Sequence, residues 1–113
     1  MRPFRVLVLS LLAMSALTPF GQAQDANRGK HLFMADGCYE CHGTVGQGGA
    51  AAPRIAPDPL PAAALSAYVR KPGGVMPPYA QSVLSDQDTA DIQAYLAGIP
   101  QPKAVKDIPQ LAP

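Results

Sequence analysis

The sequence predicts a small all-α domain of three or four helices. Within residues 62–70 and 85–98, apolar side chains recur at positions i, i+3 and i+4, which form one face of a helix. Residues that can start a helix precede both segments, and prolines and glycines follow them. Strand and helix patterns do not alternate around the two cysteines, as they would in an α/β fold.

The first helix is expected to begin near residue 25 and to run towards the cysteines. Asp25 or Asn27 can cap it, since either side chain can accept a hydrogen bond from a free backbone N–H of the first turn. The helix then extends through residues 28–34. We therefore expect this helix to position the cysteines and the site that they form.

The motif Cys38-Tyr39-Glu40-Cys41-His42 carries the strongest functional signal in the chain. C-x-x-C-H is the attachment signature of c-type haem. At helical spacing Cys38, Cys41 and His42 project from one side of a single turn. Two thiols can add across the two haem vinyl groups, and the imidazole can hold the iron. The motif therefore predicts one haem c, tethered by both cysteines and ligated by His42.

Two other interpretations of the cysteines stay open. The first is a thiol–disulfide redox motif that is followed by a histidine by chance. The second is a structural zinc site, which normally needs four nitrogen or sulfur ligands. Only Cys38, Cys41, His31 and His42 could supply them.

A long loop is expected after the motif. Residues 43–52 are rich in glycine and alanine, and four prolines follow within nine residues: Pro53, Pro57, Pro59 and Pro61. Proline fixes φ and lacks a backbone N–H, so this segment is neither regular helix nor central strand. We expect the loop to lie against the haem edge.

The second helix is predicted over residues 62–70. Asp58 and the prolines after it could start the helix. Its apolar face would carry Leu65, Tyr68 and Val69. Pro72 and the two glycines that follow would end it.

The last helix has the clearest boundaries. Ser85 is the expected N-cap, and Asp88 stands where the glutamate or glutamine of a capping box usually lies. Gly98, followed by Pro100, would end the helix. Its buried stripe is predicted to consist of Ile92, Tyr95 and Leu96.

The N-terminus is typical of an export signal. Arg2 and Arg5 precede an apolar run over residues 6–17, and Gly21-Gln22-Ala23 supplies small residues for a signal peptidase. We expect residues 1–23 to be removed and the mature protein to be periplasmic, without a membrane span. An uncleaved membrane anchor is the alternative. Haem attachment of this type takes place outside the bacterial cytoplasm, where free thiols would otherwise oxidise.

The expected mature chain has about 90 residues, which is near the size where an apolar core alone is marginal. A covalently held haem would complete that core. Loss of Arg2 and Arg5 leaves seven lysines and arginines against eight acidic residues, so no basic footprint for nucleic acid is present. We divide the chain into a signal peptide (1–23), a helical domain (24–100) and a proline-rich, extended tail (101–113).

The order of these features resembles the class I monohaem cytochromes c of bacteria. The resemblance covers residues 25–99 and includes the C-x-x-C-H motif, the glycine-rich loop, Pro53, Met76-Pro77 and Tyr95-Leu96. It implies the small cytochrome c fold, with three or four helices around one covalently bound haem. It also implies that the protein carries single electrons and is not itself an enzyme.

The resemblance further implies that Met76 is the sixth iron ligand. In that family the distal ligand is a methionine in a loop before the last helix, and residues 74–79 look like that loop. A neutral thioether favours reduced iron and raises the reduction potential. Met76 could instead fill a gap in the core. Met34 and His31 are weaker candidates, because they are expected on the helix that carries His42 and could not reach the opposite haem face.

Three further haem contacts are expected from the resemblance. The Pro53 carbonyl would accept the second N–H of His42, which fixes the tautomer of the ring. Arg54 either approaches a haem propionate or faces solvent. Tyr79, at the end of the Met76 loop, completes the set of expected cofactor-binding residues.

The residues expected where the first helix packs on the last are also similar to those of the family. Gly29, Phe33 and Tyr95 resemble the crossing of these helices, although ordinary core packing explains them nearly as well. Phe33 stands five residues before Cys38, whereas four is familiar in many relatives. This spacing predicts a local irregularity at Gly37.

The predicted function is one-electron transfer between protein partners. A dehydrogenase subunit is the expected donor, and an oxidase or another cytochrome is the expected acceptor. The chain could be the cytochrome subunit of a periplasmic dehydrogenase or a freely diffusing carrier. The alternatives are a five-coordinate haem protein that binds or senses a gas, and a thiol–disulfide oxidoreductase.

Overall fold

The computed structural model describes residues 22–111, and within that range every regular element is helical. In chain order the elements are α1 (Ala26–Ala35), α2 (Cys38–His42), α3 (Ala62–Arg70), α4 (Asp86–Ala97) and the short 3₁₀ helix η1 (Val105–Asp107). The all-α prediction is confirmed. Apart from Gln22 and Ala23, the expected signal peptide lies outside the described residues.

Helix α1 begins as the sequence predicts and ends before the cysteine motif. Asp25 is the N-cap, and its carboxylate accepts hydrogen bonds from the backbone N–H groups of Asn27 (2.9 Å) and Arg28 (3.0 Å). Gly37 then adopts a left-handed conformation, with φ of +76°. This glycine conformation breaks the path between α1 and α2.

The break at Gly37 confirms the expected irregularity but corrects the placement of two residues. His31 and Met34 lie on α1, whereas His42 lies on the separate helix α2. The sequence pattern had predicted one continuous helix for all three. His31 is exposed and Met34 packs partly against the core.

Helices α1 and α4 cross at Gly29. A β-carbon at Gly29 would overlap the backbone carbonyl of Asp91, so only glycine allows this approach. On the same side, the rings of Phe33 and Tyr95 pack at 5.7 Å between centroids with a 57° tilt. The crossing expected from Gly29, Phe33 and Tyr95 is therefore present.

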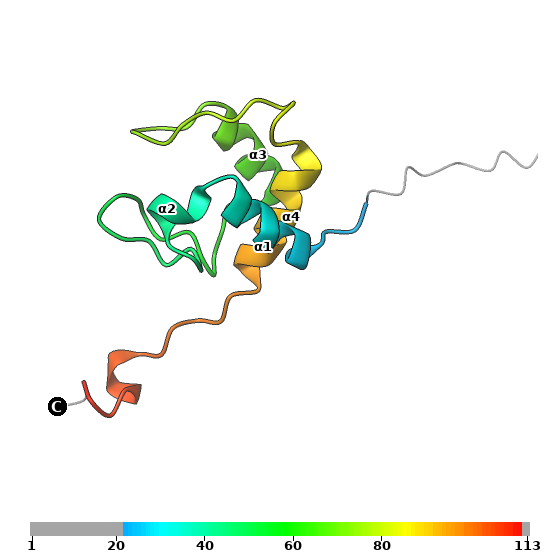
Figure 1. Cartoon of the computed structure of the whole chain (residues 1–113). Helices are drawn as coiled ribbons and strands as arrows, with labels where there is room; N and C mark the ends of the chain where they lie inside the picture. Colours follow the sequence, from blue (N-terminus) through cyan, green and yellow to red (C-terminus); the bar gives the residue numbers. More distant parts are fainter. Residues whose placement is uncertain (1–21, 112–113) are drawn as a thin grey trace, which may run out of the picture.

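The described core is small. Helix α4 contacts both α1 and α3, while α2 contacts α1 (Figure 1). Seven apolar residues are buried between these elements: Phe33, Ala56, Val69, Leu84, Ile92, Tyr95 and Leu96. The predicted stripe of α4 is thus confirmed. Among residues 22–111, no helix has the length and apolar character needed to cross a bilayer.

Helices α3 and α4 keep the predicted boundaries, with two corrections on α3. The capping box of α4 forms as expected: Ser85 and Asp88 each accept a hydrogen bond from the other's backbone N–H. The N-cap of α3 is Pro61, while Asp58 instead accepts a hydrogen bond from Gln101.

Tyr68 does not join the buried face of α3, because 43% of it is exposed. Its hydroxyl accepts a hydrogen bond from the Gly73 N–H at 3.2 Å, which keeps the polar end of the ring at the surface. Val69 and Ser66 are the buried residues of this helix.

The C-terminal segment leaves the helices after α4 and extends away from them (Figure 1). The proline-rich composition predicts this extended path. Residues 105–107 nevertheless form η1, a turn that the sequence analysis did not predict.

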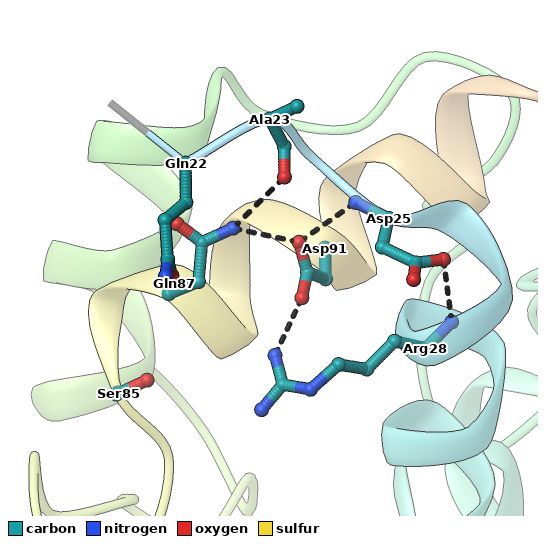
Figure 2. Close-up of a pocket in the computed structure, with 7 residues that line it drawn as sticks. All are labelled: Gln22, Ala23, Asp25, Arg28, Ser85, Gln87 and Asp91. Carbon is teal, nitrogen blue, oxygen red and sulfur yellow. Dashed lines mark hydrogen bonds and ion pairs between the residues drawn. The ribbon is translucent and has the colours of Figure 1, made fainter. Parts of the chain in front are cut away.

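A polar network locks the start of α1 onto α4 (Figure 2). Arg28 pairs with Asp91, as Figure 2 shows, and also with Asp88, which the figure does not draw. Asp91 is only 1% exposed and also accepts hydrogen bonds from the Asp25 N–H (2.9 Å) and the Gln87 amide (2.8 Å). Burial alone would raise the pKa of Asp91, but these donors outweigh it and hold the pKa below its usual value. Sequence reasoning missed this network, because no local pattern pairs residue 28 with residue 91.

Gly29→Ala should destabilise the protein despite the better helix propensity of alanine. The new methyl group would push α1 and α4 apart, and we expect a loss of about 2–3 kcal/mol in the free energy of unfolding. Urea denaturation of the purified protein measures it. Gly49→Ala is the matched control, since a β-carbon there meets nothing within 4 Å. Equal stability of the two variants would contradict the crossing.

Asp91→Asn should cost about 2 kcal/mol at pH 7, because charge-assisted hydrogen bonds to a buried carboxylate are lost. The depressed pKa of Asp91 means that its contribution is present above the usual value near 3.8 and is lost as the pH falls through the folded-state pKa. The acid decline in stability should therefore be shallower in Asp91→Asn than in the native protein. Asp58→Asn, at an exposed carboxylate, serves as the control. A parallel decline in Asp91→Asn and the native protein would refute this assignment.

Candidate functional site

The candidate site starts at α2, which consists of the motif itself. The helix is bounded by Gly37 and Gly43, both with positive φ. The Glu40 N–H donates to the Gly37 carbonyl at 3.1 Å, and the Gly43 N–H donates to the Tyr39 carbonyl at 2.9 Å. One isolated helical turn between two glycines therefore presents Cys38, Cys41 and His42, as their spacing predicts.

The two thiols differ in environment. Cys38 is partly buried and packs against the core, whereas Cys41 is exposed, and neither is in a disulfide. Burial raises the pKa of the Cys38 thiol to about 11, an effect that Asp36 strengthens and Tyr79 partly offsets. Redox-active C-x-x-C motifs instead lower the pKa of their nucleophilic thiol.

The imidazole of His42 is oriented by the loop that follows α2. Its Nδ1 lies 2.8 Å from the Pro53 carbonyl oxygen. A carbonyl can only accept a hydrogen bond, so Nδ1 is the donor in this contact, and in the neutral ring Nε2 then keeps its lone pair. This is the arrangement that a metal-ligating histidine commonly has. The structure thus contains the contact that the family resemblance implies for Pro53.

Glycines fold the loop back far enough to place Pro53. The Gly48 N–H donates to the His42 carbonyl at 2.7 Å, and Gly48 has φ of +76°. A β-carbon on Gly48 would overlap the Arg54 backbone. Sequence reasoning predicted a glycine-rich loop but did not assign this role to Gly48. Gly48 lies against the backbone of Pro53 and Arg54, and this contact can be recognised only when the path of the loop is known.

Arg54 is anchored to its own loop. Its Nε donates to the Ala56 carbonyl at 2.7 Å, and the residue is exposed. The sequence left open whether Arg54 approaches a propionate or faces solvent. The hydrogen bond to the Ala56 carbonyl fixes the Nε of Arg54, which is the guanidinium nitrogen nearest the backbone.

Met76 lies on the loop between α3 and α4. It is partly buried and packs against the core, although the preceding Val75 is 89% exposed. Tyr79, three residues later, donates its hydroxyl to the Asp36 carbonyl oxygen at 2.7 Å. The Met76 loop is thereby tied to the junction between α1 and α2.

The donor set fits a covalently bound haem. Two unpaired thiols and an oriented imidazole are the groups that attachment and ligation of a c-type haem need, and a methionine thioether is a common further ligand in cytochromes c. Several partly buried apolar residues surround the small core and could contact a large apolar group: Leu32, Met34, Cys38, Tyr39, Ile55, Leu65, Met76, Tyr79 and Ile99. In the part of the chain that is described, no three His, Cys, Asp or Glu side chains gather as a metal cluster, which gives the zinc interpretation no support.

Two surface hollows lie elsewhere. One, of about 520 Å³, is lined by the Arg28–Asp91 network and neighbouring residues (Figure 2). The other, of about 260 Å³, lies between Ser66 and Asp86. Among the described residues, neither hollow is lined by cysteine, histidine or methionine, so neither offers the soft ligands of the C-x-x-C-H region.

One family of known proteins matches the chain. The model of the family described as "Cytochrome C oxidase, cbb3-type, subunit III" matches residues 24–96. This range includes α1, the cysteine motif, Pro53, the Met76 loop and nearly all of α4. No curated protein and no solved structure matches the chain.

Proposed function

Since the chain belongs to the family of cytochrome c domains described as cbb3-type oxidase subunit III, we propose that it is an exported one-electron carrier with His42 and Met76 as axial ligands. The family makes the protein a monohaem, class I-like cytochrome c, so haem-based electron transport follows from membership itself. The ligands, the covalent links and the location are our proposal.

The orientation of His42 is the observation that carries this proposal. The 2.8 Å contact from Nδ1 to the Pro53 carbonyl directs the lone pair of Nε2 away from the loop. Tethering to Pro53 also limits rotation of the ring, so the imidazole is preorganised for a metal. When bound, the haem supplies the one-electron couple.

Cys38 and Cys41 are proposed to anchor the porphyrin. Each sulfur would bond to one carbon of a vinyl group, and the thiol hydrogen would end on the other carbon. Cys38 is partly buried and Cys41 is exposed, and neither is in a disulfide, so both sulfurs are free to form such bonds. The raised pKa of Cys38 disfavours the thiol–disulfide alternative, which needs a readily formed thiolate.

Met76 is proposed as the neutral, soft ligand on the opposite side. Its partial burial and contact with the core shield the side chain in part from solvent. Pro77 and Pro78 limit the backbone freedom of the loop after it. A closed sixth position would leave no vacancy for a gas, which separates the carrier from the sensor hypothesis.

We further propose that residues 1–23 direct export and that the domain over 24–100 works in the periplasm. There it would accept electrons from a dehydrogenase and pass them to an oxidase or another cytochrome. Gel filtration of the protein from its own host distinguishes a dedicated dehydrogenase subunit from a free carrier. Co-elution with a large flavin, quinone or molybdenum protein supports the first, and elution as a small protein supports the second.

Covalent haem is the first test. Protein produced with cytochrome c maturation machinery should retain its pigment on a denaturing gel and after acid-acetone extraction, because thioether bonds survive both. The Cys38→Ala/Cys41→Ala double variant should lose it. Pigment that is fully extracted from the native protein would contradict the covalent assignment.

Met76→Ala should lower the reduction potential on the order of 0.1 V, because a thioether stabilises ferrous iron. It should also abolish the sulfur-to-iron charge-transfer band and let carbon monoxide bind the ferrous form at once. Met34→Ala is the control, since Met34 is also a partly buried methionine but lies on α1. An unchanged potential in Met76→Ala would remove Met76 from its role.

A further inference from the structure

We propose that Tyr79 is a positioning residue that keeps Met76 on the iron by tying its loop to the start of the haem-binding motif. The inference rests on the proposed Met76 ligation and extends it. Its basis is the hydroxyl of Tyr79, which donates to the Asp36 carbonyl oxygen at 2.7 Å. Asp36 is the C-cap of α1 and lies two residues before Cys38.

The backbone at Tyr79 is fixed on the side of α3. Its N–H donates to the Val69 carbonyl at 2.8 Å. Its carbonyl accepts from the Arg70 guanidinium at 3.1 Å, and the same guanidinium holds the Gln81 side chain at 2.8 Å. The backbone of Tyr79 is therefore held against the end of α3 by hydrogen bonds on both its N–H and its carbonyl.

The side chain of Tyr79 then reaches across to the other ligand-bearing segment. Within the described residues, the hydrogen bonding between residues 71–84 and residues 26–42 comes from this hydroxyl, which donates to the Asp36 carbonyl oxygen and also interacts with the Cys38 thiol. These two segments carry Met76 and His42, the proposed ligands on opposite sides of the iron. A single side-chain hydroxyl thus connects the two sides of the site.

The rest of the Met76 loop has few other restraints. Val75 is 89% exposed, and a β-carbon on Gly74 would meet nothing within 4 Å. Between Met76 and Tyr79 lie Pro77 and Pro78, whose rings fix φ. The stiff connection transmits the position of Tyr79 to Met76, so loosening Tyr79 should loosen the thioether.

Displacement of the sixth ligand measures this effect. An added ligand such as imidazole can bind ferric iron only where Met76 has left, so its apparent affinity reports how firmly the thioether is held. Loss of one neutral hydrogen bond should make imidazole bind about three- to tenfold more tightly to Tyr79→Phe than to the native holoprotein. The charge-transfer band should weaken in parallel.

Tyr95→Phe is the matched control. It also removes a tyrosine hydroxyl that donates to a backbone carbonyl, that of Thr44 at 2.8 Å, but it leaves the Met76 loop untouched. Thermal unfolding of both variants compares their stability. Equal imidazole affinity in the two variants, or no change in Tyr79→Phe, overturns the proposal.

A double-mutant cycle separates positioning from a general opening of the site. In a Met76→Ala background no thioether remains to be held, so adding Tyr79→Phe should leave imidazole affinity unchanged. The same three- to tenfold gain in that background overturns the role of Tyr79 alone. If the native protein binds imidazole as tightly as Met76→Ala does, the proposed Met76 ligation fails, and the role of Tyr79 fails with it.

Discussion

The close contact of α1 with α4 is the constraint on which the other elements depend. Gly29 removes the side chain that would separate the two helices, and Phe33 packs against Tyr95 on the same side. Helix α2 is positioned through α1, and α3 is positioned through α4. The arrangement of the cysteine motif relative to the Met76 loop therefore follows from one crossing. Arg28, Asp88 and Asp91 reinforce it at the edge with a partly buried ion-pair network.

The chemical groups of the site come from short segments and loops, and hydrogen bonds to backbone carbonyls place them. The Pro53 carbonyl orients the His42 ring, and the Asp36 carbonyl holds the Tyr79 hydroxyl. A backbone acceptor is rigid and uncharged, so it fixes a ring without adding a charge near the iron. In this chain, loop segments orient the side chains of the site, whereas the regular helices form the core.

Several acidic side chains of the helical domain have structural roles. Asp25 caps α1, and Asp88 completes the capping box of α4 with the N-cap Ser85. Asp86 and Asp91 accept hydrogen bonds from side chains on other elements. These carboxylates are committed to folding, and three of them lie within the first two turns of α4. Net charge is consequently a poor guide to the surface that meets a redox partner, because much of the negative charge is already paired.

Local sequence patterns are sufficient to predict the fold class, the bounds of α3, the capping box of α4 and the residues of the cysteine motif. Each of these depends on neighbours within a few residues, where spacing and capping chemistry act directly. Tertiary packing sets the exposure of Tyr68, the Arg28–Asp91 network and the hydrogen-bond partner of Tyr79. Those features join residues that are far apart in the chain or depend on which face another element covers, and no local pattern encodes that information.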